Sequence, residues 1–65
     1  MRLKELREDS ETPQRVLAEY LKIKQNTYSQ YENGIRQLPT DVLVKLARYY
    51  NVSTDYILGL NKNNK

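Results

Sequence analysis

The sequence predicts an all-α fold in one compact domain. Both glycines and both prolines lie between segments with helical periodicity, and no segment shows the alternating β-branched residues of a strand. The 65 residues contain no internal repeat and no linker, so we expect a five-helix domain over 1–60, followed by a disordered tail over 61–65. A chain of this size buries about 60% of its unfolded surface, which leaves little room for an internal substrate cavity.

Two helices are expected in the amino-terminal third. The segment 2–9 has two leucines on one face and charged residues elsewhere, which is the pattern of a short amphipathic helix. A second helix is expected over 13–21, because Thr12 offers a hydroxyl as amino-terminal cap and Pro13 suits the first helical position. The inner face of this helix has three apolar residues, Leu17, Ala18 and Leu21.

A third helix is expected over 25–33, after a brief turn. Tyr28 and Tyr31 share one side of this helix and should face the core. The pair Asn33-Gly34 supplies a left-handed stop at its end. The opposite side of the helix has only amides and hydroxyls, from Gln25, Asn26, Ser29, Gln30 and Asn33.

The last two helices complete the domain. The fourth has the clearest periodicity in the chain, and we expect Thr40 to cap it and Asn51 to close it. Its apolar face consists of Leu43, Leu46, Ala47 and Tyr50. A short fifth helix is expected over 54–58, with Ser53 as its cap and Gly59 as its stop.

The composition excludes several functions. The chain has neither cysteine nor histidine, so disulfides, thiolate metal clusters and the usual general base are all missing. Because a glycine-rich phosphate loop is missing too, we expect no enzyme, no metal and no cofactor. Apolar runs are far shorter than the roughly 20 residues that span a bilayer, and nothing resembles a signal peptide. We therefore expect a cytoplasmic protein without a membrane or small-molecule partner. A net charge of +3 is compatible with nucleic acid without requiring it.

The amide-rich side of the third helix is the first indication of function. A carboxamide has a donor and an acceptor side by side, which matches the N7 and N6 edge of adenine. Gln25 and Asn26 lie at the amino end of the helix, the end that reaches deepest into the major groove in a helix-turn-helix. The short connection to the second helix suits such a crossing. An ordinary polar helix surface is the alternative, since Gln and Asn are common on surfaces.

A series of motifs extends over nearly the whole chain. They are the opening MRLKELRE, the stretch TPQRVLAEYLKIKQNTYSQYENG over 12–34 with its final Tyr31-Glu32-Asn33-Gly34, and the later LVKLARYYNVSTDYILG. In this order they resemble the Xre-type helix-turn-helix regulators, the group that contains the lambdoid phage repressors and Cro proteins. The resemblance implies the phage-repressor fold, with helices two and three as the helix-turn-helix. It also implies a sequence-specific transcriptional regulator that reads double-stranded DNA with the third helix.

The resemblance implies roles for particular residues. Those at base-reading positions are Gln25, Asn26, Ser29 and Gln30, with Lys24 beside them. Those expected to contact phosphates are Gln14, Asn33, Arg36 and Arg7. Arg7 and Glu32 also match a structural ion pair between the first helix and the end of the third, and loss of one partner should cost about 3–5 kcal/mol. For Asn33 and Arg36, the alternatives are a helix cap and a solvated loop charge.

Three residues depart from the pattern of these regulators. Lys22 stands where the turn usually has a left-handed glycine, a conformation that costs lysine about 1 kcal/mol. Tyr28 replaces a β-branched residue, and its hydroxyl needs a partner or water. Lys24 stands where serine or threonine commonly caps the third helix, so we expect a weak cap there.

The leading hypothesis is a repressor that binds as a homodimer to a palindromic operator, with half-sites about 34 Å apart. It would be bacterial or phage-encoded and associated with the nucleoid. The expected dimer contacts are Ile57, Leu58 and Leu60, with the alternative that Ile57 completes the core. The alternative function is a protein-binding module such as an antitoxin, although such a surface should expose aromatic or aliphatic anchors. The final NKNNK fits both a complete small regulator and the amino-terminal domain of a longer one.

Overall fold

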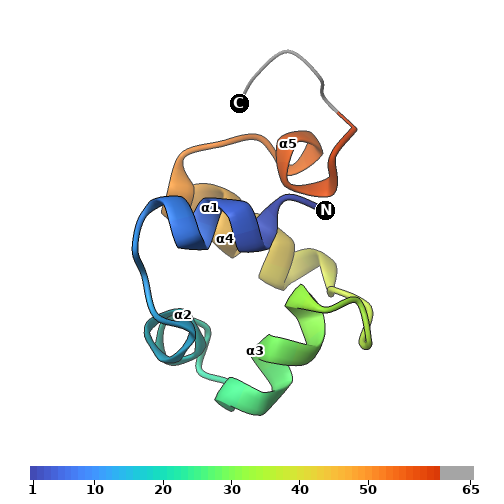
Figure 1. Cartoon of the computed structure of the whole chain (residues 1–65). Coiled ribbons are helices and arrows are strands. Elements are labelled where there is room, and N and C mark those ends of the chain that lie inside the picture. The colour runs from blue at the N-terminus through green and yellow to red at the C-terminus, as the bar shows by residue number, and fades with distance from the viewer. Residues whose placement is uncertain (61–65) are drawn as a thin grey trace.

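The computed structural model describes residues 1–60, which form five α-helices. The helices are α1 (Leu3–Asp9), α2 (Gln14–Leu21), α3 (Gln25–Glu32), α4 (Thr40–Tyr50) and α5 (Thr54–Leu58) (Figure 1). No strand occurs among the described residues, and the predicted all-α fold is confirmed. None of the helices in this part of the chain is long and apolar enough to cross a membrane. The tail predicted for 61–65 lies outside the described residues.

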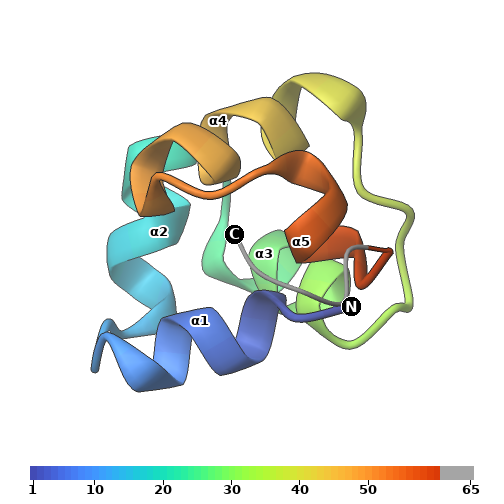
Figure 2. The ribbon, with the colours of Figure 1, turned by 90° about the horizontal axis from the view of Figure 1, so that it is seen from above.

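Two pairs of consecutive helices pack together. α2 packs against α3, and α4 packs against α5. In Figure 1, α2 and α3 lie at the bottom and α5 lies at the top, with α1 and the amino terminus between them. Seen from above, α1, α2 and α4 lie around three sides of α3 and α5, and the loop between α3 and α4 runs along the remaining side (Figure 2). The backbone N of Arg2 donates to the carbonyl of Ile57 at 2.7 Å, and Arg2 Cζ lies 5.5 Å from the centre of the Tyr56 ring. The first residues are therefore held against α5.

Every helix contributes a large, fully buried side chain to the core. These side chains are Leu3, Leu17, Tyr28, Leu46 and Ile57, in the order of the helices. The inner face of α4 differs from the expected one, because Val42 is buried while Leu43 and Tyr50 are only partly buried. All these positions of α4 belong to one broad apolar stripe, and periodicity alone does not show which part of a stripe lies deepest.

Two predicted helix caps are wrong. α2 and α4 begin after Pro13 and Pro39, which occupy the cap positions in an extended conformation, and neither helix has a side-chain cap hydrogen bond. The proline carbonyls accept the first helical hydrogen bonds, at 3.1 and 2.9 Å. Proline serves here because its fixed φ near −65° suits the residue that precedes a helix. Thr12 therefore lies outside α2, and Thr40 becomes the first residue of α4.

The other predicted helix signals are confirmed. The Oγ of Ser53 accepts the backbone N–H three residues further on, at 3.0 Å, and caps α5. Left-handed residues follow several helices: Lys22 has φ 60°, Asn51 has φ 57° and Gly59 has φ 80°. Gly34, the stop predicted after α3, has φ 75°. Lys22 thus adopts the conformation that strains a lysine.

Lys22→Gly is expected to raise the free energy of unfolding by about 1 kcal/mol. At φ 60° the Cβ of a lysine lies close to the following carbonyl oxygen, and glycine removes this clash. Urea unfolding followed by circular dichroism measures the change. Asn51→Gly is the matched control, since asparagine tolerates the left-handed region better and its replacement should gain less. A Lys22→Gly variant less stable than the unsubstituted chain would contradict this account.

Candidate nucleic-acid interface

The turn between α2 and α3 sets the direction of α3. α2 ends at Leu21, Lys22 turns the chain in the left-handed conformation, and α3 begins at Gln25. Ile23, within the turn, packs against the core, and its N–H donates to the carbonyl of Ala18 at 3.0 Å. In Figure 1, α2 is seen nearly end-on while α3 runs across the view, so the two helices cross at a wide angle. This is the predicted connection of a helix-turn-helix.

The orientation of α3 about its axis follows from its tyrosines. Tyr28 and Tyr31 are 0% and 6% exposed, as predicted, so the opposite side of α3 is turned outward. On that outward side lie amides and hydroxyls without any charge, the amide surface of Gln25, Asn26, Ser29, Gln30 and Asn33. Gln25, Asn26 and Asn33 are exposed, and Ser29 and Gln30 are half-buried. The predicted base-reading residues therefore share one side of the molecule.

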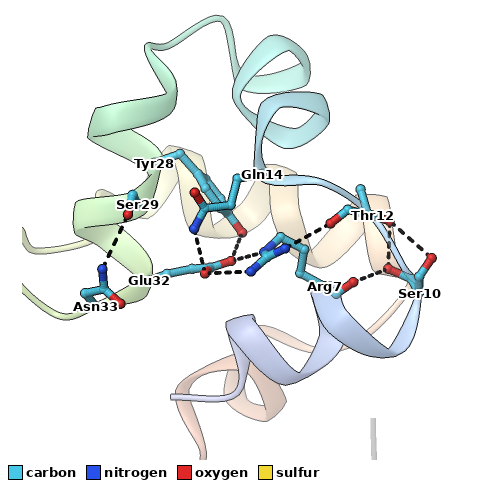
Figure 3. Close-up of polar contacts among 8 residues, drawn as sticks. All are labelled: Arg7, Ser10, Thr12, Gln14, Tyr28, Ser29, Glu32 and Asn33. Carbon is cyan, nitrogen blue, oxygen red and sulfur yellow. Dashed lines mark hydrogen bonds and ion pairs between the residues drawn. The ribbon is translucent and has the colours of Figure 1, made fainter.

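Two cations lie at the ends of the amide surface. Lys24 is exposed at the amino end of α3, where its side chain makes no cap hydrogen bond, as expected for a weak cap. Arg36 is exposed in the loop after α3, and its Nε donates to Gln30 Oε1 at 3.1 Å. Asn33, the other predicted phosphate residue of this region, donates from Nδ2 to Ser29 Oγ at 3.3 Å (Figure 3). The amide surface is thus continuous with the loop.

A second polar group, the Glu32 cluster, joins α1, α2 and α3. It consists of Arg7, Gln14, Tyr28 and Glu32 (Figure 3). Glu32 accepts hydrogen bonds from Nε and Nη2 of Arg7, from Gln14 Nε2 at 3.1 Å and from the Tyr28 hydroxyl at 2.8 Å. Arg7 Nη1 donates to the carbonyl of Thr12 at 3.0 Å. The predicted contact between Arg7 and Glu32 is therefore present, in side chains that are 14% and 1% exposed.

Two predicted phosphate residues, Arg7 and Gln14, belong to the Glu32 cluster. Each nitrogen of the Arg7 guanidinium has a partner within the protein, which favours the structural role for this residue. The side-chain nitrogen of Gln14 points to Glu32, so a phosphate contact by Gln14 stays a prediction. Sequence reasoning missed Tyr28 as a partner of Glu32. The spacing of four residues on one helix was the available signal, because it places two side chains on the same side.

The Glu32 cluster keeps the carboxyl of Glu32 ionised. Burial alone would raise its pKa, but the hydrogen bonds from Arg7, Tyr28 and Gln14 outweigh burial, and the pKa of Glu32 lies below its ordinary value of 4.5. The hydrogen bond to Glu32 raises the pKa of Arg7. Burial, together with Glu32, raises the pKa of Tyr28. At neutral pH, where Glu32 is charged, both donors therefore keep their protons.

Stability is expected to fall in acid through Glu32. Because the pKa of Glu32 is lower in the folded than in the unfolded chain, its charge stabilises the fold above the ordinary pKa of 4.5. This contribution is lost as the pH falls through the lower pKa of the folded state. Urea unfolding between about pH 6 and pH 3 measures the loss. Glu32→Gln is expected to lose less stability over the same interval, and an equal loss in both proteins would exclude Glu32 as its source.

The residues predicted as dimer contacts differ in exposure. Ile57 is fully buried, which favours the alternative that it completes the core, so its side chain is not offered to a partner. Leu58 and Leu60 are 40% and 71% exposed. They lie at and just after the end of α5, the helix at the top of Figure 1, whereas α3 lies at the bottom.

The fold and the amide surface together define a class of domain. Two helices joined by a tight turn, the second held by buried tyrosines with polar side chains facing outward, constitute a helix-turn-helix domain. The helix-turn-helix family model matches residues 3–57, and the chain belongs to this family. The expected kinship with Xre-type regulators is confirmed.

Two curated relatives come from Bacillus subtilis (strain 168). The HTH-type transcriptional regulator ImmR is 47% identical over 64 residues, which cover 98% of this chain and 50% of ImmR. The uncharacterized HTH-type transcriptional regulator YobD is 46% identical over 59 residues, which cover 91% of this chain and 53% of YobD. The chain thus spans about half the length of the curated relatives it matches. No solved structure gives a significant match.

Proposed function

We propose that this chain is the DNA-binding domain of a sequence-specific transcriptional regulator and places α3 in the major groove of double-stranded DNA. The observation that supports this most strongly is the amide surface, which turns outward because Tyr28 and Tyr31 are buried. A protein-binding surface would be expected to offer apolar anchors instead. Two relatives over nearly the whole chain have names that describe transcriptional regulators.

In this proposal base reading and phosphate contact use different residues. Gln25 and Asn26, exposed in the first turn of α3, enter the groove deepest and offer amide donors and acceptors to base edges. Ser29 and Gln30 follow them on the same side, with Lys24 beside them. Asn33 and Arg36 contact the DNA backbone. Arg7 and Gln14 contribute through the Glu32 cluster, which fixes the start of α2 relative to α3.

We further propose a homodimer that binds a palindromic operator and represses transcription on the nucleoid of a bacterial or phage-infected cell. A two-fold symmetric protein matches a palindrome, and two half-sites multiply the weak affinity of one small domain. Leu58 and Leu60 are two of the exposed apolar residues and the ones that we assign to this contact, at 40% and 71% exposure. Both residues lie at the end of α5, whereas the amide surface belongs to α3 and its carboxyl end, so in this proposal dimer contact and groove reading use different elements.

The proposal is tested by selection from random duplex DNA with the purified chain. We expect enrichment of an inverted repeat with half-site centres about 34 Å apart, roughly one helical turn. Affinity should fall steeply between about 50 and 200 mM salt, because phosphate contacts release counterions. Binding that stays weak, enriches no sequence and depends on salt alone would refute sequence-specific regulation. Enrichment of single half-sites without a repeat would refute the dimer alone.

A further inference from the structure

The loop after α3 folds back onto one residue of the amide surface. Gly34, with φ 75°, reverses the chain. The backbone N–H groups of Ile35 and Arg36 then both donate to the backbone carbonyl of Gln30, at 3.0 and 3.2 Å. The side chain of Arg36 returns to the same residue, because its Nε donates to Gln30 Oε1 at 3.1 Å. Three hydrogen bonds, two of them from Arg36, therefore hold this part of the loop against Gln30.

The chemistry of this pair determines which way the amide of Gln30 points. A guanidinium has only donors, so the amide must turn its oxygen toward Arg36 and its nitrogen away. Because the bond involves a charged donor, it is stronger than a bond between two neutral groups. Only Nε of Arg36 is used in this contact, and the terminal nitrogens extend further along the same side chain. Arg36 can thus orient Gln30 and contact a phosphate at the same time.

We propose that Arg36 sets the base preference of Gln30 by holding the oxygen of its amide turned toward the guanidinium. Adenine is read by an amide that both donates to N7 and accepts from N6, whereas guanine shows two acceptors, N7 and O6. With its oxygen turned to Arg36, Gln30 offers the groove mainly an amide donor, and guanine becomes its preferred base. Arg36 is therefore a positioning residue for base reading. The proposal rests on the proposed function, since it presupposes that α3 lies in the major groove.

Gln25 and Asn26 differ from Gln30 in this respect. Both lie in the first turn of α3, at the end of the helix far from the loop, and both are exposed. Their amides can rotate to present donor and acceptor together, which suits adenine. The same chemical group is thus expected to read different bases at the two ends of α3, because Arg36 orients the amide at the carboxyl end.

Selection from random duplexes with four proteins tests the proposal: the unsubstituted chain, Gln30→Ala, Arg36→Met and the double variant. The base pair read by Gln30 is the one whose preference Gln30→Ala abolishes. There we expect the unsubstituted chain to prefer guanine over adenine by roughly tenfold, and Arg36→Met to reduce this preference below about threefold. In the Gln30→Ala background, Arg36→Met should weaken all sequences alike and alter no base preference.

Lys24→Met is the matched control for the lost charge. It removes one cation from the other end of α3 and should leave the preference at the Gln30 position unchanged. The proposal is overturned if Arg36→Met weakens every sequence equally while guanine stays preferred. It is also overturned if the unsubstituted chain prefers adenine at that position, because the oxygen of Gln30 would then be available to the base.

A measurement without DNA separates this proposal from the proposed function. In the free protein, the Nε–H of Arg36 should exchange with solvent more slowly than in Gln30→Ala, as followed by nuclear magnetic resonance. Equal exchange rates would overturn the pairing itself, even if the chain selects an operator. A chain that shows slow exchange but enriches no DNA sequence would instead refute the proposed function and leave Arg36 and Gln30 as a structural pair.

Discussion

Glu32→Gln is expected to lower the free energy of unfolding by about 3 kcal/mol. The glutamine keeps the shape of the side chain but has one oxygen in place of two. It can accept from Gln14 or from Tyr28 but not from both, because these donors lie 3.1 and 2.8 Å from different carboxylate oxygens. It cannot neutralise Arg7, whose side chain is only 14% exposed. A partly buried cation without its counterion is the costly product of this substitution. In a domain this small, the loss approaches the whole margin of stability.

Urea unfolding at neutral pH measures this effect, with Glu19→Gln as the matched control. Glu19 lies exposed on α2, and its replacement should change the free energy of unfolding by less than about 0.5 kcal/mol. Both substitutions remove one negative charge, but only the charge of Glu32 is paired with Arg7. If Glu32→Gln and Glu19→Gln unfold at the same urea concentration, the Glu32 cluster contributes nothing to stability and its role must be sought elsewhere.

Gln25→Ala is expected to weaken binding to the selected operator by about tenfold or more at each half-site. Gln25 is exposed in the first turn of α3, where an amide reaches a base edge directly. Two half-sites multiply the effect, so a palindrome should lose roughly a hundredfold in affinity. Binding to unrelated DNA should hardly change, because phosphate contacts dominate it. Competition between operator and scrambled duplexes at constant salt measures both quantities.

Gln37→Ala is the matched control for Gln25→Ala, because it removes another exposed glutamine side chain. Gln37 is exposed in the loop between α3 and α4, beyond the amide surface. Its replacement should preserve the ratio between operator and scrambled affinities. If Gln25→Ala also preserves that ratio, α3 does not read bases through its amino end, and the helix must be turned differently in the groove.

The sequence predicted the helices better than their first residues. Periodicity located α4, and the spacing of Tyr28 and Tyr31 located the inner side of α3, because both signals depend only on the period of a helix. The caps at Thr12 and Thr40 were wrong, because a neighbouring proline took the cap position in each case. A choice between two adjacent candidates for one cap depends on the path of the preceding loop, which periodicity does not describe.

The candidate site likewise has features that the sequence predicts and features that depend on the folded chain. The polar side chains on the outward side of α3 could be predicted, since burial of one side of a helix determines the other. The hydrogen bonds of Gln14 and Gln30 could not, because their partners Glu32 and Arg36 come within reach only after packing and loop closure. The helical periodicity of the sequence thus predicts which side chains of α3 face outward. The direction of each amide on that surface is a property of the folded chain.

The hydrogen bond from Arg2 to Ile57 has a practical consequence for handling this domain. It joins the beginning of the chain to α5, so the two must separate when either one unfolds. A fluorescent label attached at Met1, which is 54% exposed, would therefore report the detachment of α5. Its emission, followed in rising urea, would show whether this contact opens before the rest of the domain.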